Sequence, residues 1–149
     1  MAEHKALLED AQGRLARARS MFLLLADEDA AAYEKLNGLM RLPEDHPDRV
    51  AAWAGAVAGA LGPPRAMLAA ASDVLRLCEE LLGKVNEHLR SDLAVAAVLA
   101  EAAARSAAWN VAVNLPLVDE GRQESIGEET ARLTREAAER AGRVEAGCA

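Results

Sequence analysis

The sequence predicts an all-α bundle of about four or five long helices, in one domain of 149 residues. Alanine accounts for 35 residues and hydrophobic residues for 52%, whereas aromatic residues make up only 3%. Strands of a β-sandwich or barrel favour β-branched and aromatic side chains, so the composition argues against both architectures. Five prolines and ten glycines leave few interruptions and therefore predict few, long elements.

The first helix is expected from about residue 5 to residue 42. Its apolar side chains recur at close to the 3.6-residue period of an α-helix. Pro43 and Pro47 mark the break that follows, and Asp45 or Asp48 is placed to cap the next helix.

The second helix is expected over residues 48–85, with Gly62-Pro63-Pro64 in its middle. Proline lacks the amide donor and clashes with the preceding turn, so this segment must kink or interrupt the helix. Small residues also recur four apart on this helix, a spacing that lets helix backbones approach closely. They predict either tight internal packing or a subunit interface, and they form two faces, Ala51/Gly55/Gly59 and Ala52/Ala56/Ala60.

The third helix is expected to begin near Ser91-Asp92 and to end before Pro116. Residues 116–124 are expected to form a loop. Ser125 and Glu128 have the spacing of a capping box, so the fourth helix is expected from Ser125 toward Ala146, with residues 143–149 frayed.

Charge and hydropathy exclude several kinds of partner. The chain has 17 basic and 24 acidic residues, and its scattered basic residues make a nucleic-acid partner improbable. The longest clean apolar run, residues 50–61, is 12 residues and too short to span a membrane. The N-terminal residues do not resemble a signal peptide, and two cysteines do not suggest a disulfide framework. We therefore expect a cytoplasmic protein.

No strong catalytic or metal-binding motif stands out on its own. His4, His46 and His88 fall in different elements and do not form a ligand pair, so no metal site is predicted. Cys78 lies between Leu77 and Leu81 on an apolar face and is expected to be a small core residue.

Polar residues at helical spacing form two stripes. Asp29, Tyr33 and Asn37 share one face of the first helix. Asp92 and Asn110 share a face of the third helix but lie about 27 Å apart along it, so they can line a long groove or meet other residues across a dimer. A purely structural alternative is a solvated Asp29, an N-cap at Ser91 or Asp92, and asparagines bonded to neighbouring helices.

Four segments resemble, in order and in interval, the C-terminal family of formiminotransferase-cyclodeaminases. The first two are an acidic-aromatic helix and an "LP" turn; the others are an asparagine-containing turn followed by "SD-x-x-VAA", and an "EAA…NV-x-x-NL" segment. They are residues 27–33, residues 41–43, residues 86–97 and residues 101–115.

The resemblance implies an all-α, homodimeric folate enzyme. Its activity is that of a formiminotetrahydrofolate cyclodeaminase, a lyase, or of a methenyltetrahydrofolate cyclohydrolase. Both reactions pass through a tetrahedral carbon between nitrogens and need a group that shuttles a proton. The implied substrate is a tetrahydrofolate one-carbon derivative, and neither a metal nor a redox cofactor is required.

The resemblance also assigns the candidate site residues. Asp92, in the matching "SD" motif, is the first choice for the acid/base or for anchoring the substrate, and a carboxylate at a helix start is stabilised as the anion. The second-choice catalytic residues are Asp29 and Tyr33, and the substrate-binding candidates are Ser91, Asn86, Asn110 and Asn114.

A Pro-Gly-Gly-Gly-Ser-like turn and an alanine-rich helix precede this region in the family and have no counterpart here. We therefore expect a domain that is short at its N-terminus, with uncovered apolar surface and self-association through Ala51/Gly55/Gly59 and the third helix. The alternative function is a truncated, inactive helical dimer that binds folate or a protein partner.

Overall fold

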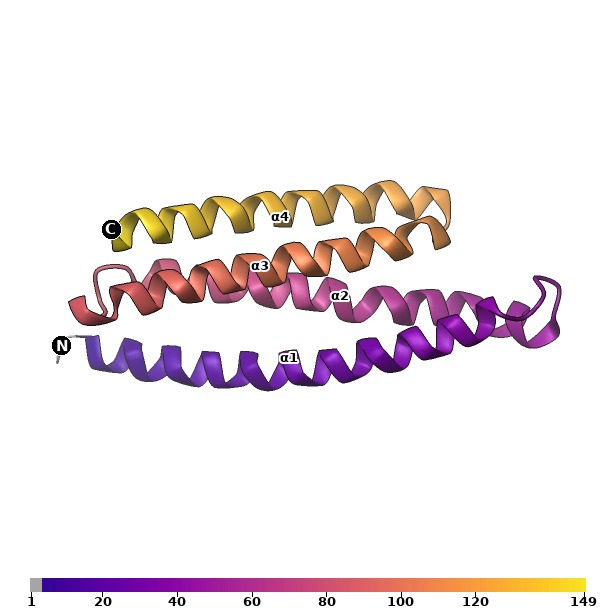
Figure 1. Ribbon diagram of the computed structural model, residues 1–149, viewed down its shortest axis with the longest axis horizontal. Coiled ribbons are helices and arrows are strands. Elements are labelled where there is room, and N and C mark those ends of the chain that lie inside the picture. Colours follow the sequence, from indigo (N-terminus) through magenta and orange to yellow (C-terminus); the bar gives the residue numbers. More distant parts are fainter. Residues whose placement is uncertain (1–3) are drawn as a thin grey trace.

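The computed structural model describes residues 4–149 and contains four long helices within that range. They run alternately up and down, so that each helix is antiparallel to the next (Figure 1). The all-α bundle is therefore confirmed. The helices are α1 (Lys5–Met40), α2 (Pro47–Leu81), α3 (Arg90–Asn114) and α4 (Glu120–Cys148), with short 3₁₀ turns η2 (Glu87–Leu89) before α3 and η3 (Leu115–Leu117) after it.

The N-cap of α2 is a histidine, His46, rather than an aspartate. The Nδ1 atom of His46 accepts a hydrogen bond from the Asp48 amide at 3.2 Å, and Pro47 occupies the first turn. The expected caps Asp45 and Asp48 are therefore wrong, although Asp48 does lie in the first turn of the helix.

The second helix ends four residues earlier than expected. Gly83 adopts the left-handed conformation, with φ of 71°, and the Lys84 amide donates to the Leu81 carbonyl. Glycine enters this conformation without a Cβ clash and commonly follows a helix end.

α2 passes through its proline pair without a break. Pro63 and Pro64 are both buried inside the helix, so the expected interruption is wrong, while a bend at this position stays a prediction. Each proline still removes one amide donor, and Pro64 leaves the carbonyl of Ala60, four residues earlier, without its helical partner. That carbonyl accepts a hydrogen bond from the side chain of Asn114 on α3 instead.

α4 is longer at both ends than expected. It begins at Glu120 rather than Ser125, because the amides of Arg122 and Gln123 both bond the Asp119 carbonyl. Ser125 thus lies inside the helix and caps nothing, and most of the expected loop is helical. At the other end the helix continues to Cys148, where fraying was expected.

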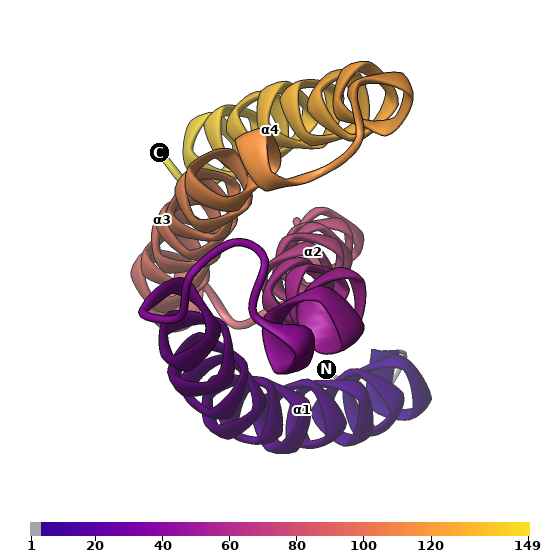
Figure 2. The same cartoon turned by 90° about the vertical axis from the view of Figure 1, so that its right-hand side faces the viewer.

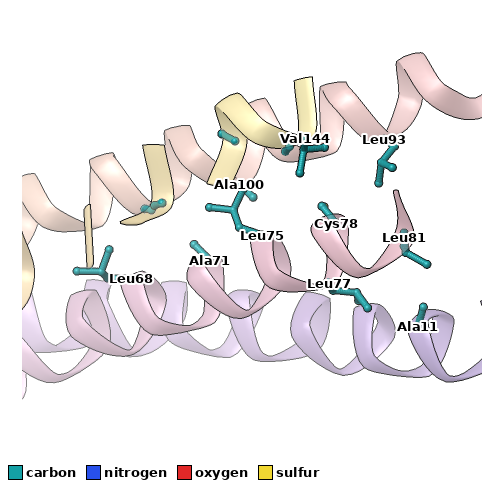
Figure 3. Close-up of a cluster of buried hydrophobic side chains, with 14 of the residues drawn as sticks. Ala11, Leu68, Ala71, Leu75, Leu77, Cys78, Leu81, Leu93, Ala100 and Val144 are labelled. Carbon is teal, nitrogen blue, oxygen red and sulfur yellow. The ribbon is translucent and has the colours of Figure 1, made fainter. Parts of the chain in front are cut away.

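The core lies where α2, α3 and α4 meet (Figure 3). Alanines on α3 keep the helices close, since a methyl group fills little space between them. Larger side chains on α2, among them Leu68 and Leu75, fill the remaining space and are almost completely buried. The buried alanines of α3 are Ala97, Ala100, Ala104 and Ala107.

Ion pairs fasten α2 to α4 near the end of the core. Glu79 accepts hydrogen bonds from Arg140 and, at 2.7 Å, from the Nε atom of Arg143. Burial by itself raises the pKa of Glu79, but the hydrogen bonds from Arg143 and Arg140 outweigh it and hold that pKa below its usual value. The carboxylate therefore stays charged and paired at neutral pH.

α1 packs chiefly on α2, and it lies on the opposite side of α2 from α4 (Figure 2). The bundle is thus open beside α1, and apolar side chains on α1 and α3 remain exposed. Within residues 4–149, every helix is too short or too polar to cross a membrane.

Candidate functional site

Three predicted site residues gather at the start of α3. Asn86 caps η2, its Oδ1 atom accepting the His88 amide at 3.0 Å, and Ser91 and Asp92 follow in the first turn of α3. The N-cap position belongs to Leu89, which caps with no side-chain hydrogen bond. An N-cap role for Ser91 or Asp92 is therefore wrong, because η2 runs directly into α3 and moves its start to Arg90.

The Asp92 carboxylate is exposed and free of ion pairs within residues 4–149. It lies in the first turn of α3. The carboxylate is thus available to a substrate or to a partner rather than used within the described part of the fold.

Asp29 and Tyr33 lie in the second half of α1. Asp29 and Asn37 are partly buried, whereas Tyr33 is 67% exposed. α1 and α3 run in the same direction (Figure 1), so Asp29 and Tyr33 lie away from the end of the bundle that holds Asp92.

Asn110 and Asn114 lie in the last turns of α3 and differ in their surroundings. Asn110 is exposed. The Nδ2 atom of Asn114 donates to the carbonyls of Ala60 and Asn110, both at 3.2 Å. The bond to Ala60 fits the structural alternative for this asparagine, and it leaves only its Oδ1 atom for a substrate.

We expect Asn114→Ala to lower the free energy of unfolding by about 1–2 kcal/mol, because the Ala60 carbonyl loses its substitute donor. Urea unfolding followed by circular dichroism measures the loss. In a Pro64→Ala background the new amide can bond Ala60, so the same substitution should cost less. Asn110→Ala is the matched control and should change stability by less than about 0.5 kcal/mol. An Asn114→Ala protein as stable as the unaltered one contradicts this role.

Within one protomer the predicted site residues at the start of α3 are separated from those near its end. Asp92 and Asn110 are 18 residues apart on one helix, which places them about 27 Å apart along its axis. Exposed apolar side chains lie between and beside them, including Val95, Leu99, Trp109 and Val113. Within one protomer, Asp92 and Asn110 therefore cannot both contact the same reacting carbon of a substrate.

A shallow groove between α3 and α4 was not anticipated from the sequence. Its volume is about 530 Å³, and most of its lining is apolar, with Thr130 and Thr134 from α4. Glu101 and Arg105, four residues apart on α3, contribute an ion pair of 3.2 Å at its edge. Opposite charges four residues apart on a helix are the sequence pattern from which this ion pair could have been predicted. The lining residues of this groove include none of the predicted site residues.

The cysteines and histidines add no catalytic cluster. Cys78 is buried in the core as expected, and burial, with a contribution from Cys148, raises the pKa of its thiol. Across residues 4–149, no three His, Cys, Asp or Glu side chains gather in a way that could hold a metal ion.

Comparison with known proteins supplies the family. Residues 1–132 match the formiminotransferase-cyclodeaminase family, which spans α1 to α3 and the first part of α4. None of the curated proteins compared with the chain matches it. The family match includes every predicted site residue and most of the chain. The chain therefore belongs to the formiminotransferase-cyclodeaminase family.

Proposed function

We propose that the chain is a folate one-carbon enzyme, either a formiminotetrahydrofolate cyclodeaminase or a methenyltetrahydrofolate cyclohydrolase. Membership of the family supports a folate-related role. The observation that carries the proposal further is Asp92, an exposed carboxylate at a helix start that has no ion-pair partner among residues 4–149. A charge without a structural partner is available for chemistry.

Asp92 suits both reactions because each of them moves a proton between atoms bonded to the one-carbon unit. In the cyclohydrolase, water adds to the methenyl carbon, a proton reaches N5 and the C–N5 bond breaks to give 10-formyltetrahydrofolate. In the cyclodeaminase, N10 attacks the formimino carbon, and ammonia leaves after a proton reaches its nitrogen. A carboxylate beside that carbon accepts the proton from water or from N10 and returns it to the leaving nitrogen. It also stabilises the positive charge of the methenyl bridge.

We further propose that the site is completed in a homodimer. Seven large side chains on α1 and α3 are more than half exposed, and large exposed apolar surface of this kind marks an interface. They are Leu23 and Leu24 at 58%, Tyr33 at 67%, Val95 at 56%, Leu99 at 64%, Trp109 at 70% and Val113 at 72%. The small-residue face Ala51/Gly55/Gly59 is also exposed, whereas Ala56 and Ala60 of the other face are buried, so that face does pack internally.

Twofold symmetry offers a way to bring the two polar groups together. If α3 pairs antiparallel with its copy, each residue meets the one equally far on the other side of the centre. A centre near Glu101 places Asp92 beside Asn110 of the partner subunit. The same pairing sets Val95 and Val98 against residues 104–107 of the partner subunit, where their exposed apolar surface is covered.

We expect 5,10-methenyltetrahydrofolate to raise the melting temperature. This compound is the substrate of one candidate reaction and the product of the other, so one probe tests both. At about 100 times its Kd the ligand stabilises the native state by about 2.7 kcal/mol, a rise of about 5–10 °C for a chain of this length. Differential scanning fluorimetry measures the rise, with free glutamate as the control compound.

Activity assays then distinguish the two reactions from each other and from the inactive dimer. Loss of methenyl absorbance indicates the cyclohydrolase, while release of ammonia with a gain of that absorbance from formiminotetrahydrofolate indicates the cyclodeaminase. Thermal stabilisation without turnover supports the inactive dimer that binds folate. No thermal stabilisation removes the folate proposal and leaves a helical dimer with a protein partner.

A further inference from the structure

The groove between α3 and α4 is charged at one end only. α3 and α4 are antiparallel (Figure 1), and a Cβ atom placed at Gly127 would lie 3.6 Å from the side chain of Leu115, which fixes their register at one end of the groove. Arg105 precedes Leu115 by ten residues and Arg135 follows Gly127 by eight, so both arginines lie at the other end. The remaining lining residues, apart from Glu101, are uncharged: Ala108, Val111, Ala112, Thr130, Ala131, Thr134 and Ala138.

The charged end of the groove carries an excess of positive charge. Arg105 pairs with Glu101 at 3.2 Å, whereas Arg135 has no ion pair among residues 4–149. Two guanidinium groups and one carboxylate therefore line this end. A guanidinium group presents donors in a planar fork that matches a carboxylate, so the charge and its chemistry suit a carboxylate ligand.

The two threonines in the middle of the groove offer no free hydrogen-bond donor. The Oγ1 atom of Thr130 donates to the carbonyl of Ile126, and the Oγ1 atom of Thr134 donates to the carbonyl of Thr130, both at 2.7 Å. A polar group that is buried without a hydrogen-bond partner costs free energy. The middle of the groove therefore favours an alkyl chain over a heteroaromatic ring or an extended peptide, because both of these carry acceptors along their length.

The length and position of the groove define the ligand further. The ten residues from Arg105 to Leu115 span about 15 Å of α3. An extended chain advances about 1.2 Å per bond, so about 10–12 carbons fit this length. Ala108 follows Asp92 by 16 residues, which places it about 160° around α3 from Asp92. The groove therefore lies on the other side of α3 from Asp92 and Asn110, and the proposed homodimer leaves it open.

We propose that this groove binds a medium-chain fatty acid, with its alkyl chain along α3 and α4 and its carboxylate at Arg135 and Arg105. Charge complementarity at one end selects the anion, and the uncharged remainder of the groove accepts the chain. The volume of about 530 Å³ lies within the usual range for small-molecule sites. The proposal is independent of the folate reaction, because none of the predicted site residues lines the groove.

The test is titration of the purified full chain with dodecanoate, followed by isothermal calorimetry below the concentration at which micelles form. Binding should saturate at one dodecanoate per chain. Dodecyltrimethylammonium, which has the same chain and the opposite charge, should bind about tenfold more weakly or worse. Octanoate should also bind at least about tenfold more weakly, because each buried CH₂ group contributes up to about fourfold in Kd.

Two pairs of variants locate the binding site. Arg135→Gln should weaken dodecanoate by about fivefold or more, whereas Arg132→Gln, three residues earlier and outside the groove, should leave its Kd unchanged. Ala131→Glu places a carboxylate in the groove and should abolish binding, whereas Ser125→Glu adds the same charge outside it and should not. All four positions are exposed, so the variants should fold, and circular dichroism checks this.

Three results overturn the proposal. The first is equal affinity for the carboxylate and the ammonium compound, and the second is the same Kd in Arg135→Gln and Arg132→Gln. The third is the absence of saturable dodecanoate binding by the unaltered chain. If sedimentation then shows that Ala131→Glu, but not Ser125→Glu, lowers the oligomeric state, the groove belongs to a contact between copies of the chain instead.

Discussion

Asp92→Asn is expected to lower kcat/KM by about a hundredfold or more, while the fold and the melting temperature stay nearly unchanged. Asparagine keeps the shape of the side chain but cannot accept or return a proton. The carboxylate is exposed and unpaired within the described residues, so the fold loses at most the interaction with the helix dipole, about 0.3–1 kcal/mol. Steady-state kinetics with the tetrahydrofolate substrate measure the effect.

Glu87→Gln is the matched control, because it removes an exposed carboxylate only five residues away in η2. Its kcat/KM should remain within about twofold of the unaltered chain, since no interaction with the reacting carbon is expected there. Full activity of a folded Asp92→Asn protein would show that Asp92 is not the proton carrier. The assignment would then pass to Asp29 and Tyr33 on α1.

Trp109→Glu is expected to weaken the proposed homodimer by about a hundredfold or more in Kd and to abolish turnover. The Trp109 side chain is 70% exposed in the protomer, beside Val113 on α3. A tryptophan at the centre of an interface commonly contributes 2 kcal/mol or more, and a buried unpaired charge adds a further penalty. Sedimentation velocity over a range of concentrations measures the dissociation.

Ser125→Glu places the same side chain on an exposed position of α4 and should leave the dimer intact. The shared site has a second test in mixed dimers. If Asp92→Asn and Asn110→Ala are each inactive alone, random mixing gives half heterodimers, each with one intact site, and restores about a quarter of the activity. A monomeric unaltered chain at micromolar concentration, or mixing without recovery, contradicts the shared site.

The helices were predictable wherever one face of the helix is apolar. α1 and α3 begin and end within two residues of their expected positions, since apolar spacing and the flanking prolines define them. The start of α4 was not predictable in this way. Its first turns are polar and mostly exposed until Ile126, so they carry no periodic apolar pattern. Backbone hydrogen bonds to the Asp119 carbonyl start the helix instead.

The identity of the candidate site residues stays a prediction, and their arrangement could not be predicted from the sequence. The segments that carry the resemblance, including the one with Asp92, all lie within the residues that match the family, 1–132. The resemblance did not reveal that the Asn114 side chain donates a hydrogen bond to the Ala60 carbonyl, because that contact depends on how α3 lies against the prolines of α2. Helical spacing had already placed Asp92 and Asn110 about 27 Å apart on one helix. It did not show that Asp29 and Tyr33 lie away from the end of the bundle that holds Asp92, because that depends on how α1 runs relative to α3.

The packing of α1 on α2 has a consequence for hydrogen exchange. α2, α3 and α4 contact one another mutually, whereas α1 is held chiefly through one helix pair. Local opening of α1 breaks that single contact surface and leaves the three-helix core intact. The amides of α1 should therefore exchange with a lower free energy of opening than those of α2. In a dimer that also covers Leu23 and Leu24, the protection of α1 is thermodynamically linked to association, and each subunit then stabilises the most weakly held helix of the other.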